Sequence, residues 1–179
     1  MRIFVFFLIV ITAFVRLFFL LRSIKNEKSI RKLGGVEYAK ELSNLLIVFH
    51  VIFYLFAYYE ALNEYYSFDF WVGIGIVVYT FSVVVLFFLS RELGVYWSMR
   101  LFKVPNMPSS DYGLFKKVKY PMYVLGTIPE LIGISLMFKA EKTFAILFPL
   151  YMVLLGIRIF IEENLIKGKN VGNKRDEKG

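Results

Sequence analysis

The sequence predicts an all-α integral membrane protein with about five transmembrane helices. Of its 179 residues, 58% are hydrophobic, and the mean hydropathy is +0.61, above what the roughly half-apolar composition of soluble domains gives. The apolar residues gather into runs of about 20, the length of helix that crosses the hydrocarbon of a bilayer. Lysines and arginines concentrate in alternate loops between these runs, as expected for loops that share one side of a membrane.

Two of the five apolar runs have unusual features. The first could be a signal peptide, but only Arg2 precedes it, no small-residue cleavage site follows, and Arg16 interrupts it, so we expect a retained helix. The fourth is short and contains Pro129 and Glu130, so we expect it to be kinked and packed inside the bundle. The predicted spans are residues 3–21, 42–62, 70–89, 122–138 and 143–161.

The basic residues predict how the helices are oriented. Lysines and arginines are frequent in residues 22–41, 91–120 and 167–178, whereas few lie in the loops on the opposite side. An excess of Lys and Arg marks the cytoplasmic side of a membrane protein. With five spans, the N-terminus would therefore lie outside and the C-terminus in the cytoplasm.

Residues 1–166 are expected to form a single transmembrane domain. The connection over residues 91–121 is far longer than the roughly 2–8 residues of an ordinary helix–helix loop. Because long ordered loops usually carry function, we expect this cytoplasmic connection to hold a cofactor. The polar, glycine-containing residues 167–179 are predicted to be a disordered basic tail.

Composition excludes several kinds of site. The chain has no cysteine, which excludes disulfides, thiolate metal sites and a catalytic cysteine. A single histidine leaves no imidazole cluster for zinc, so we expect no metal. The net charge of +8 could suggest nucleic acid, but basic residues beside apolar spans are explained by membrane orientation. The expected partner is a lipid bilayer and not a nucleic acid.

A polar cluster is predicted where the last two spans meet the cytoplasmic surface. Arg158 and Glu162 stand four residues apart, so a helix places them on one face. Lys119, Tyr120 and Tyr123 lie at the start of the preceding helix. A short antiparallel helical hairpin would bring both groups together. We therefore take this cluster as the candidate site.

Ionisable residues inside the predicted spans leave alternatives open. Glu130 lies about midway along a span, where a carboxylate must be paired, protonated or beside water. It is either a helix-packing residue or part of a substrate cavity, and we assign it to the cavity as a substrate-binding residue. Arg16 either extends toward the cytoplasmic face or pairs with Glu60, Glu130 or a substrate headgroup. His50 is either a hydrogen-bonded core residue or a catalytic base.

Two motifs carry a resemblance to a known family. Residues 119–123 read Lys-Tyr-Pro-Met-Tyr, and Arg158, Ile159, Glu162 and Glu163 stand at the end of the next predicted helix. Together with the upstream segment LGVYWSMRLFKVPNMP, they resemble the bacterial branch of the isoprenylcysteine carboxyl methyltransferase family. These integral-membrane enzymes use S-adenosylmethionine, and their signature pairs Arg-His-Pro-x-Tyr with Arg-Ile-x-x-Glu-Glu.

The resemblance implies an S-adenosylmethionine-dependent methyltransferase in a bacterial or archaeal cell membrane, with its active site facing the cytoplasm. Its acceptor would be lipid-like or prenylated and would be O-methylated on a carboxylate or on an enol or phenol hydroxyl. By the same resemblance, Arg158 is the catalytic residue that orients the substrate, and Glu162 contacts the cofactor. The other cofactor positions it implies are Arg100, Met107, Pro108, Ser109, Ser110, Phe115, Tyr120, Pro121, Met122 and Tyr123.

One departure from the signature keeps other functions open. Lys119 and Tyr120 stand where the family has Arg-His, and lysine keeps the charge but loses the two-pronged guanidinium. A modified cofactor pocket, a changed substrate and a loss of activity would each fit. A phospholipid N-methyltransferase, a membrane-bound sterol-type reductase and a non-catalytic membrane subunit are the competing classes.

Overall fold

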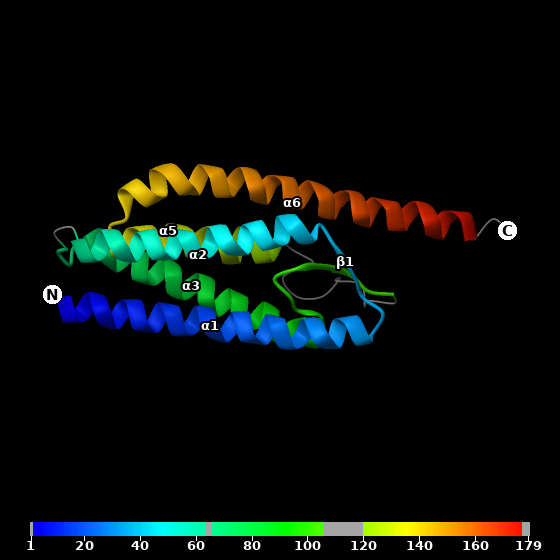
Figure 1. Cartoon of the computed structure of the whole chain (residues 1–179), viewed down its shortest axis with the longest axis horizontal. Helices are drawn as coiled ribbons and strands as arrows, with labels where there is room; N and C mark the ends of the chain where they lie inside the picture. Colours follow the sequence, from blue (N-terminus) through cyan, green and yellow to red (C-terminus); the bar gives the residue numbers. More distant parts are fainter. Residues whose placement is uncertain (1, 64–65, 106–119, 177–179) are drawn as a thin grey trace.

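The computed structural model describes residues 2–63, 66–105 and 120–176, with side chains as far as residue 165. Helices run side by side along one elongated bundle, and the two termini lie at opposite ends (Figure 1). This confirms the predicted all-α membrane class, since four helices are long and apolar enough to span a membrane and residues 122–138 form a shorter apolar helix. The helices are α1 (Arg2–Lys32), α2 (Lys40–Asn63), α3 (Phe70–Glu92), the π-helical segment η2 (Met122–Thr127) continued by α5 (Ile128–Phe138), and α6 (Glu141–Asp176).

The outward faces of these helices are apolar. Phe14 is 71% exposed, Phe70 75% and Phe160 65%. Large apolar patches are rare on soluble monomers, whereas hydrocarbon is a suitable solvent for such side chains. The surface therefore fits a bundle surrounded by lipid.

Helix α5 is the central element of the core, because Leu131, Ile134 and Phe138 are completely buried. Its preceding turn is the π-helical segment η2. Pro129 has no amide hydrogen to donate to that turn, which is consistent with the irregular helix there. The predicted interruption of the fourth span is thus a π-helical segment next to the proline.

Two helices extend beyond their predicted spans. Helix α1 continues past residue 21 to Lys32. Helix α6 continues to Asp176, so the structure differs from the prediction of a disordered tail over residues 167–179. Gly168 and Gly172 follow the span without ending the helix, and no proline stands after it.

At the end of the bundle that carries the N-terminus, carboxylates cap the helices. Asp69 accepts a hydrogen bond from the Val72 amide, 3.1 Å away, at the start of α3. Glu60 of α2 accepts from the amide and hydroxyl of Thr143, both at 2.6 Å, at the start of α6. Such groups satisfy amides that have no partner within the helix. Glu60 is therefore engaged in capping and is not the partner of Arg16.

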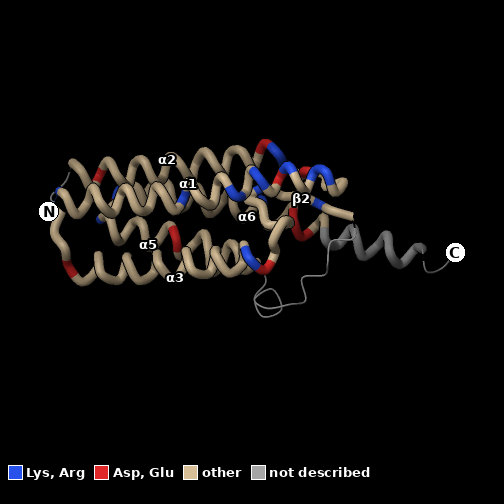
Figure 2. The backbone as a smooth tube through the Cα atoms, turned by 90° about the horizontal axis from the view of Figure 1, so that it is seen from below, with Lys and Arg blue, Asp and Glu red and all other residues tan. Residues whose placement is uncertain are grey.

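The opposite end of the bundle, called the strand end here, holds the only sheet among the described residues. Strand β1 (Val36–Tyr38) pairs antiparallel with β2 (Leu101–Lys103), and Glu37 lies opposite Phe102. A 3-10 helix, η1 (Gly94–Tyr96), precedes β2. Lysines and arginines gather around this end (Figure 2). The described parts of the basic loops 22–41 and 91–120 therefore lie together at the strand end, as expected for loops on one side of a membrane.

Candidate active site

Arg158, Tyr123 and Glu162 form a hydrogen-bonded chain near the strand end. The Arg158 Nε donates to the Tyr123 hydroxyl at 2.9 Å, and this hydroxyl donates to Glu162 Oε2 at 2.8 Å. Tyr123 comes from η2, and the other two residues come from α6. The predicted hairpin thus brings these three residues together, with Tyr123 placed between the two charged groups.

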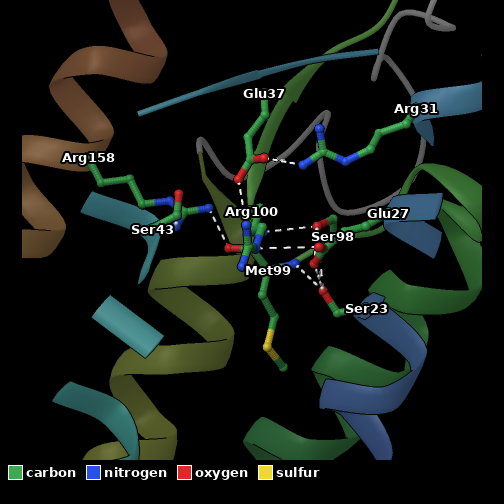
Figure 3. A network of polar contacts seen from close by, with 9 residues as sticks. All are labelled: Ser23, Glu27, Arg31, Glu37, Ser43, Ser98, Met99, Arg100 and Arg158. Atoms are coloured by element: carbon green, nitrogen blue, oxygen red, sulfur yellow. Dashed lines mark hydrogen bonds and ion pairs between the residues drawn. The ribbon is translucent and has the colours of Figure 1, made fainter. Parts of the chain in front are cut away.

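The remaining guanidinium nitrogens of Arg158 bind two other parts of the chain. Nη1 donates to the Ser43 hydroxyl of α2 at 3.3 Å, and Nη2 donates to the Met99 carbonyl at 2.6 Å (Figure 3). Arg158 is only 4% exposed. These bonds use three of the five N–H donors and fix the guanidinium, which is well suited to present its charge in one direction. Arg158 therefore ties α2, η2 and the segment before β2 to α6.

Arg100 is held by two carboxylates at the strand end (Figure 3). Its Nη1 lies 2.8 Å from Glu37 Oε1, and its Nε lies 3.4 Å from Glu27 Oε2. Glu37 also pairs with Arg31. Burial opposes ionisation of the Glu37 carboxyl, but hydrogen bonds from Arg100 and Arg31 outweigh burial and lower its pKa below the ordinary value. The stability that Glu37 contributes is therefore present above the unfolded carboxyl pKa and is lost as pH falls through the lowered one.

A cavity of about 50 Å³ extends from Arg158 into the membrane-spanning part of the bundle. Arg158 and Tyr123 line it together with Arg16, His50 and Tyr151. That volume holds a few water-sized groups. Its other lining residues are Phe19, Leu46, Ile47, Leu86, Trp97, Met99, Met122, Thr127 and Leu155.

Deeper in the bundle, Glu130 is the centre of a buried polar cluster. Arg16 Nη1 lies 3.2 Å from both carboxylate oxygens of Glu130, and the Tyr54 hydroxyl donates to Oε1 at 2.6 Å. His50 Nε2 lies 3.5 Å from the same oxygen, and its Nδ1 lies 3.3 Å from the Tyr151 hydroxyl. Of the alternatives open for Arg16, the structure shows the pair with Glu130. Glu130 reaches the cavity only through its contacts with Arg16 and His50, which line it.

Comparison with known proteins identifies the family. The model of the isoprenylcysteine carboxyl methyltransferase (ICMT) family matches residues 72–167. An uncharacterized protein of Haemophilus influenzae is 36% identical over 150 residues, which cover 84% of this chain and 87% of that protein. The chain belongs to the isoprenylcysteine carboxyl methyltransferase family.

A second relative supports this membership. The uncharacterized protein YpbQ of Bacillus subtilis is 29% identical over 149 residues, which cover 82% of this chain and 87% of YpbQ. No solved structure matches the chain. As a member of the ICMT family with apolar, membrane-length helices, the protein is a membrane methyltransferase. The cavity beside Arg158 lies within the part of the chain that the family model covers, except for the residues of α1 and α2.

Of the other predicted cofactor positions of this ICMT family member, some lie near Tyr123 and others fall outside the described residues. Tyr120 adopts a left-handed conformation with φ of 59° and stacks on Tyr123 at 6.3 Å between ring centroids. Pro121 precedes η2, and Met122 lines the cavity. Five positions lie outside the described residues: Met107, Pro108, Ser109, Ser110 and Phe115.

Sequence reasoning missed Tyr151 and Trp97 as cavity residues. Tyr151, Leu155, Arg158 and Glu162 are spaced at intervals of four, three and four residues, which places them on one face of α6. This spacing could have predicted that Tyr151 lies on the same helix face as Arg158. Trp97 lies outside the helices, so no periodicity pointed to it.

Proposed function

We propose that this protein is an S-adenosylmethionine-dependent methyltransferase that O-methylates a lipid-like acceptor at the cytoplasmic membrane face, on a carboxylate or on an enol or phenol hydroxyl. The chain Arg158–Tyr123–Glu162 at one end of an intramembrane cavity is the observation that carries this proposal. A cation, a hydroxyl and a carboxylate lie together there, which supports a site that a soluble cofactor and a membrane-borne acceptor would share.

The donor set near Tyr123 fits a positively charged cofactor. S-Adenosylmethionine supplies an electrophilic methyl group on a sulfonium, and it also carries an ammonium. Glu162 is a half-buried carboxylate that accepts a hydrogen bond from the Tyr123 hydroxyl, and the half-buried ring of Tyr120 stacks on the buried ring of Tyr123. Carboxylates and aromatic faces both attract cations. These three residues would hold the cofactor.

Arg158 suits the task of holding the acceptor. Its buried guanidinium lines the cavity and is fixed by Tyr123, Ser43 and Met99. A fixed cation in a water-poor site attracts an anionic oxygen more strongly than it would in water. Arg158 would therefore align the acceptor oxygen, and alignment is the main contribution a protein makes to an in-line displacement.

The orientation follows from the charge distribution. Many of the described lysines and arginines gather around the strand end, which carries β1 and β2 (Figure 2). Because such residues are retained on the cytoplasmic side, the active site would face the cytoplasm of a bacterial or archaeal cell. The acceptor's apolar part would then remain in the bilayer.

The test is calorimetric binding of S-adenosylmethionine and S-adenosylhomocysteine to purified protein in nanodiscs. Glu162→Ala is expected to weaken binding of both, because it removes the carboxylate that faces the cofactor. Arg158→Lys is expected to bind both like the parent and to lose turnover, since lysine keeps the charge but not the fork. Glu92→Ala, which removes an exposed carboxylate at the end of α3, is the matched control.

Two results would contradict the proposal. Parent-like binding and turnover in both site variants would show that the site lies elsewhere. Absence of cofactor binding in folded protein would instead indicate a membrane subunit that has lost the cofactor site.

A further inference from the structure

Tyr151, His50 and Glu130 form a line of polar groups that starts at the wall of the cavity. Tyr151 and His50 line the cavity, and Glu130 lies behind them. The Tyr151 hydroxyl is 3.3 Å from His50 Nδ1, and His50 Nε2 is 3.5 Å from Glu130 Oε1. The three residues come from α6, α2 and α5, so the line exists only in the folded bundle.

The carboxylate determines which nitrogen of His50 can accept a proton. A neutral imidazole has one N–H and one lone pair. With the hydrogen on Nε2, facing the Glu130 carboxylate, the lone pair of Nδ1 is directed at the Tyr151 hydroxyl, which can donate to it. At 3.5 Å, His50 Nε2 makes no hydrogen bond among the described residues, and Glu130 Oε1 is the charged oxygen beside it. Contacts of acid–base groups are often long before substrate binds. His50 is therefore arranged to accept a proton through Tyr151.

Charged and titratable groups face His50 from every neighbouring helix. They are Arg16 on α1, Tyr54 on α2, Glu130 on α5 and Tyr151 on α6. Arg16 and Glu130 offset each other's charge, and Tyr54 donates to the carboxylate. Such groups are costly inside a membrane and usually serve function there.

Resting on the methyltransferase function proposed above, we propose that Tyr151 and His50 accept the proton of the methyl acceptor, which is therefore a lipid-like phenol or enol and not a carboxylate. The acceptor O–H bond breaks as its proton passes to the Tyr151 oxygen, and the proton of Tyr151 passes to His50 Nδ1. The acceptor oxygen uses the released electron pair to bond the methyl carbon, while the leaving thioether keeps the pair of the broken C–S bond. The imidazolium later returns its proton to water.

The two acceptor classes differ in whether they need this relay. A carboxylic acid is already ionised at neutral pH, so its methylation releases no proton. A phenol or enol releases one proton for each methyl group transferred. Tyr151 and His50, called the proton relay here, are needed only for a hydroxyl acceptor. A requirement for them therefore distinguishes the two acceptor classes.

Trp97 adds a donor for the charge that develops on the acceptor oxygen. Its ring is 1% exposed and lines the cavity, and its Nε1 has no hydrogen-bond partner among the described residues. A buried donor without a partner is unfavourable. An acceptor oxygen in the cavity would give Trp97 a partner, and Arg158 would contribute the positive charge on the same wall.

The test compares two acceptors with the same tail, using full-length protein in nanodiscs and tritium-labelled S-adenosylmethionine. Para-pentadecylphenol is protonated at neutral pH, whereas its nitro derivative with nitro groups at both ortho positions is ionised. Tyr151→Phe and His50→Gln are each expected to lower turnover of the phenol by about 10²- to 10⁴-fold, the usual contribution of acid–base groups. Both variants are expected to retain turnover of the ionised nitro derivative, because it has no proton to give.

Two further measurements separate the relay from a structural role. Binding of S-adenosylhomocysteine by calorimetry, and binding of the nitro derivative followed by its visible absorption, are expected to match the parent in both variants. Tyr58→Phe removes a partly buried hydroxyl, bonded to Thr12 at 2.9 Å and away from the cavity lining, and is expected to leave turnover of both phenols unchanged.

Three outcomes would overturn the inference. Equal losses on the two phenols would show that the line of residues is structural. Methylation of hexadecanoic acid, with neither phenol accepted, would show a carboxylate acceptor. Failure of the parent to bind S-adenosylhomocysteine would remove the methyltransferase function itself, a result distinct from the other two.

Discussion

Arg16 and Glu130 face each other inside the membrane-spanning part of the bundle, and each would be costly alone. Glu130 is 2% exposed and accepts hydrogen bonds from Arg16 and Tyr54. Taking an ion out of water carries a free-energy penalty that only a close partner offsets. Each of these two charges therefore needs the other to be stable in the bundle, although the residues are 114 positions apart in the chain.

Single substitutions of this pair are expected to destabilise the fold. Arg16→Met or Glu130→Met alone should lower the free energy of unfolding by about 3–5 kcal/mol, because the remaining charge is buried without its partner. The double variant should recover most of that loss. Reversible unfolding in mixed detergent micelles measures this, with Lys25→Ala on the exposed side of α1 as control. A double variant as unstable as either single one would contradict the expectation.

The close approach of α3 and α5 depends on glycine. A Cβ added at Gly75 would lie 2.4 Å from the Met137 amide nitrogen, and one at Gly133 would lie 2.6 Å from the Tyr79 amide nitrogen. Backbone atoms cannot move aside as flexible side chains can. Small residues allow such tight packing between membrane helices, where dispersion contacts replace the hydrophobic effect. The contact supports Glu130, because α5 carries it.

Two glycines on α3 offer a matched pair of substitutions. Gly75→Ala is expected to destabilise the protein by about 1–3 kcal/mol, since the methyl group meets the α5 backbone. Gly73→Ala meets nothing within 4 Å and is expected to be neutral or to stabilise by up to about 1 kcal/mol through helix propensity. Unfolding in micelles again provides the measurement. Similar effects at both positions would show that α3 and α5 do not approach this closely.

The whole molecule separates two chemically different ends. The end with the N-terminus is closed by capping carboxylates, Asp69 and Glu60. The strand end carries the sheet and Arg100, which is held by Glu37 and Glu27 (Figure 3). The Arg158–Tyr123–Glu162 chain lies near the same end. In the function proposed above, the lipid-like acceptor would approach from the bilayer and the soluble cofactor from the strand end.

Cysteine labelling tests which end faces the cytoplasm, and the absence of native cysteine removes background. Asn63→Cys and Lys32→Cys place single thiols at exposed positions on opposite ends of the bundle. In intact bacterial cells, a membrane-impermeant maleimide is expected to label Asn63→Cys and to reach Lys32→Cys only after permeabilisation. The reverse pattern would mean that the active site faces outward.

Much of the fold could be predicted from the chain alone. Apolar runs of membrane length indicated where helices α1 to α3 and α6 cross, and the Pro129 position indicated the irregular fourth crossing. The four-residue spacing of Arg158 and Glu162, with Tyr123 one hairpin away, indicated the centre of the candidate site. These inferences depend on local properties: run length, charge placement and helical periodicity.

The pairing of the intramembrane polar residues is visible only in the tertiary structure. The apolar runs predicted that Arg16, His50 and Glu130 lie inside spans, but they left Arg16 with several candidate partners. The physical reason is that lipid-facing and core-facing surfaces of a membrane helix are both apolar, so hydropathy does not show which face turns inward. The contact of Arg16 with Glu130, and of His50 with Tyr151, arises only when α1, α2, α5 and α6 pack together.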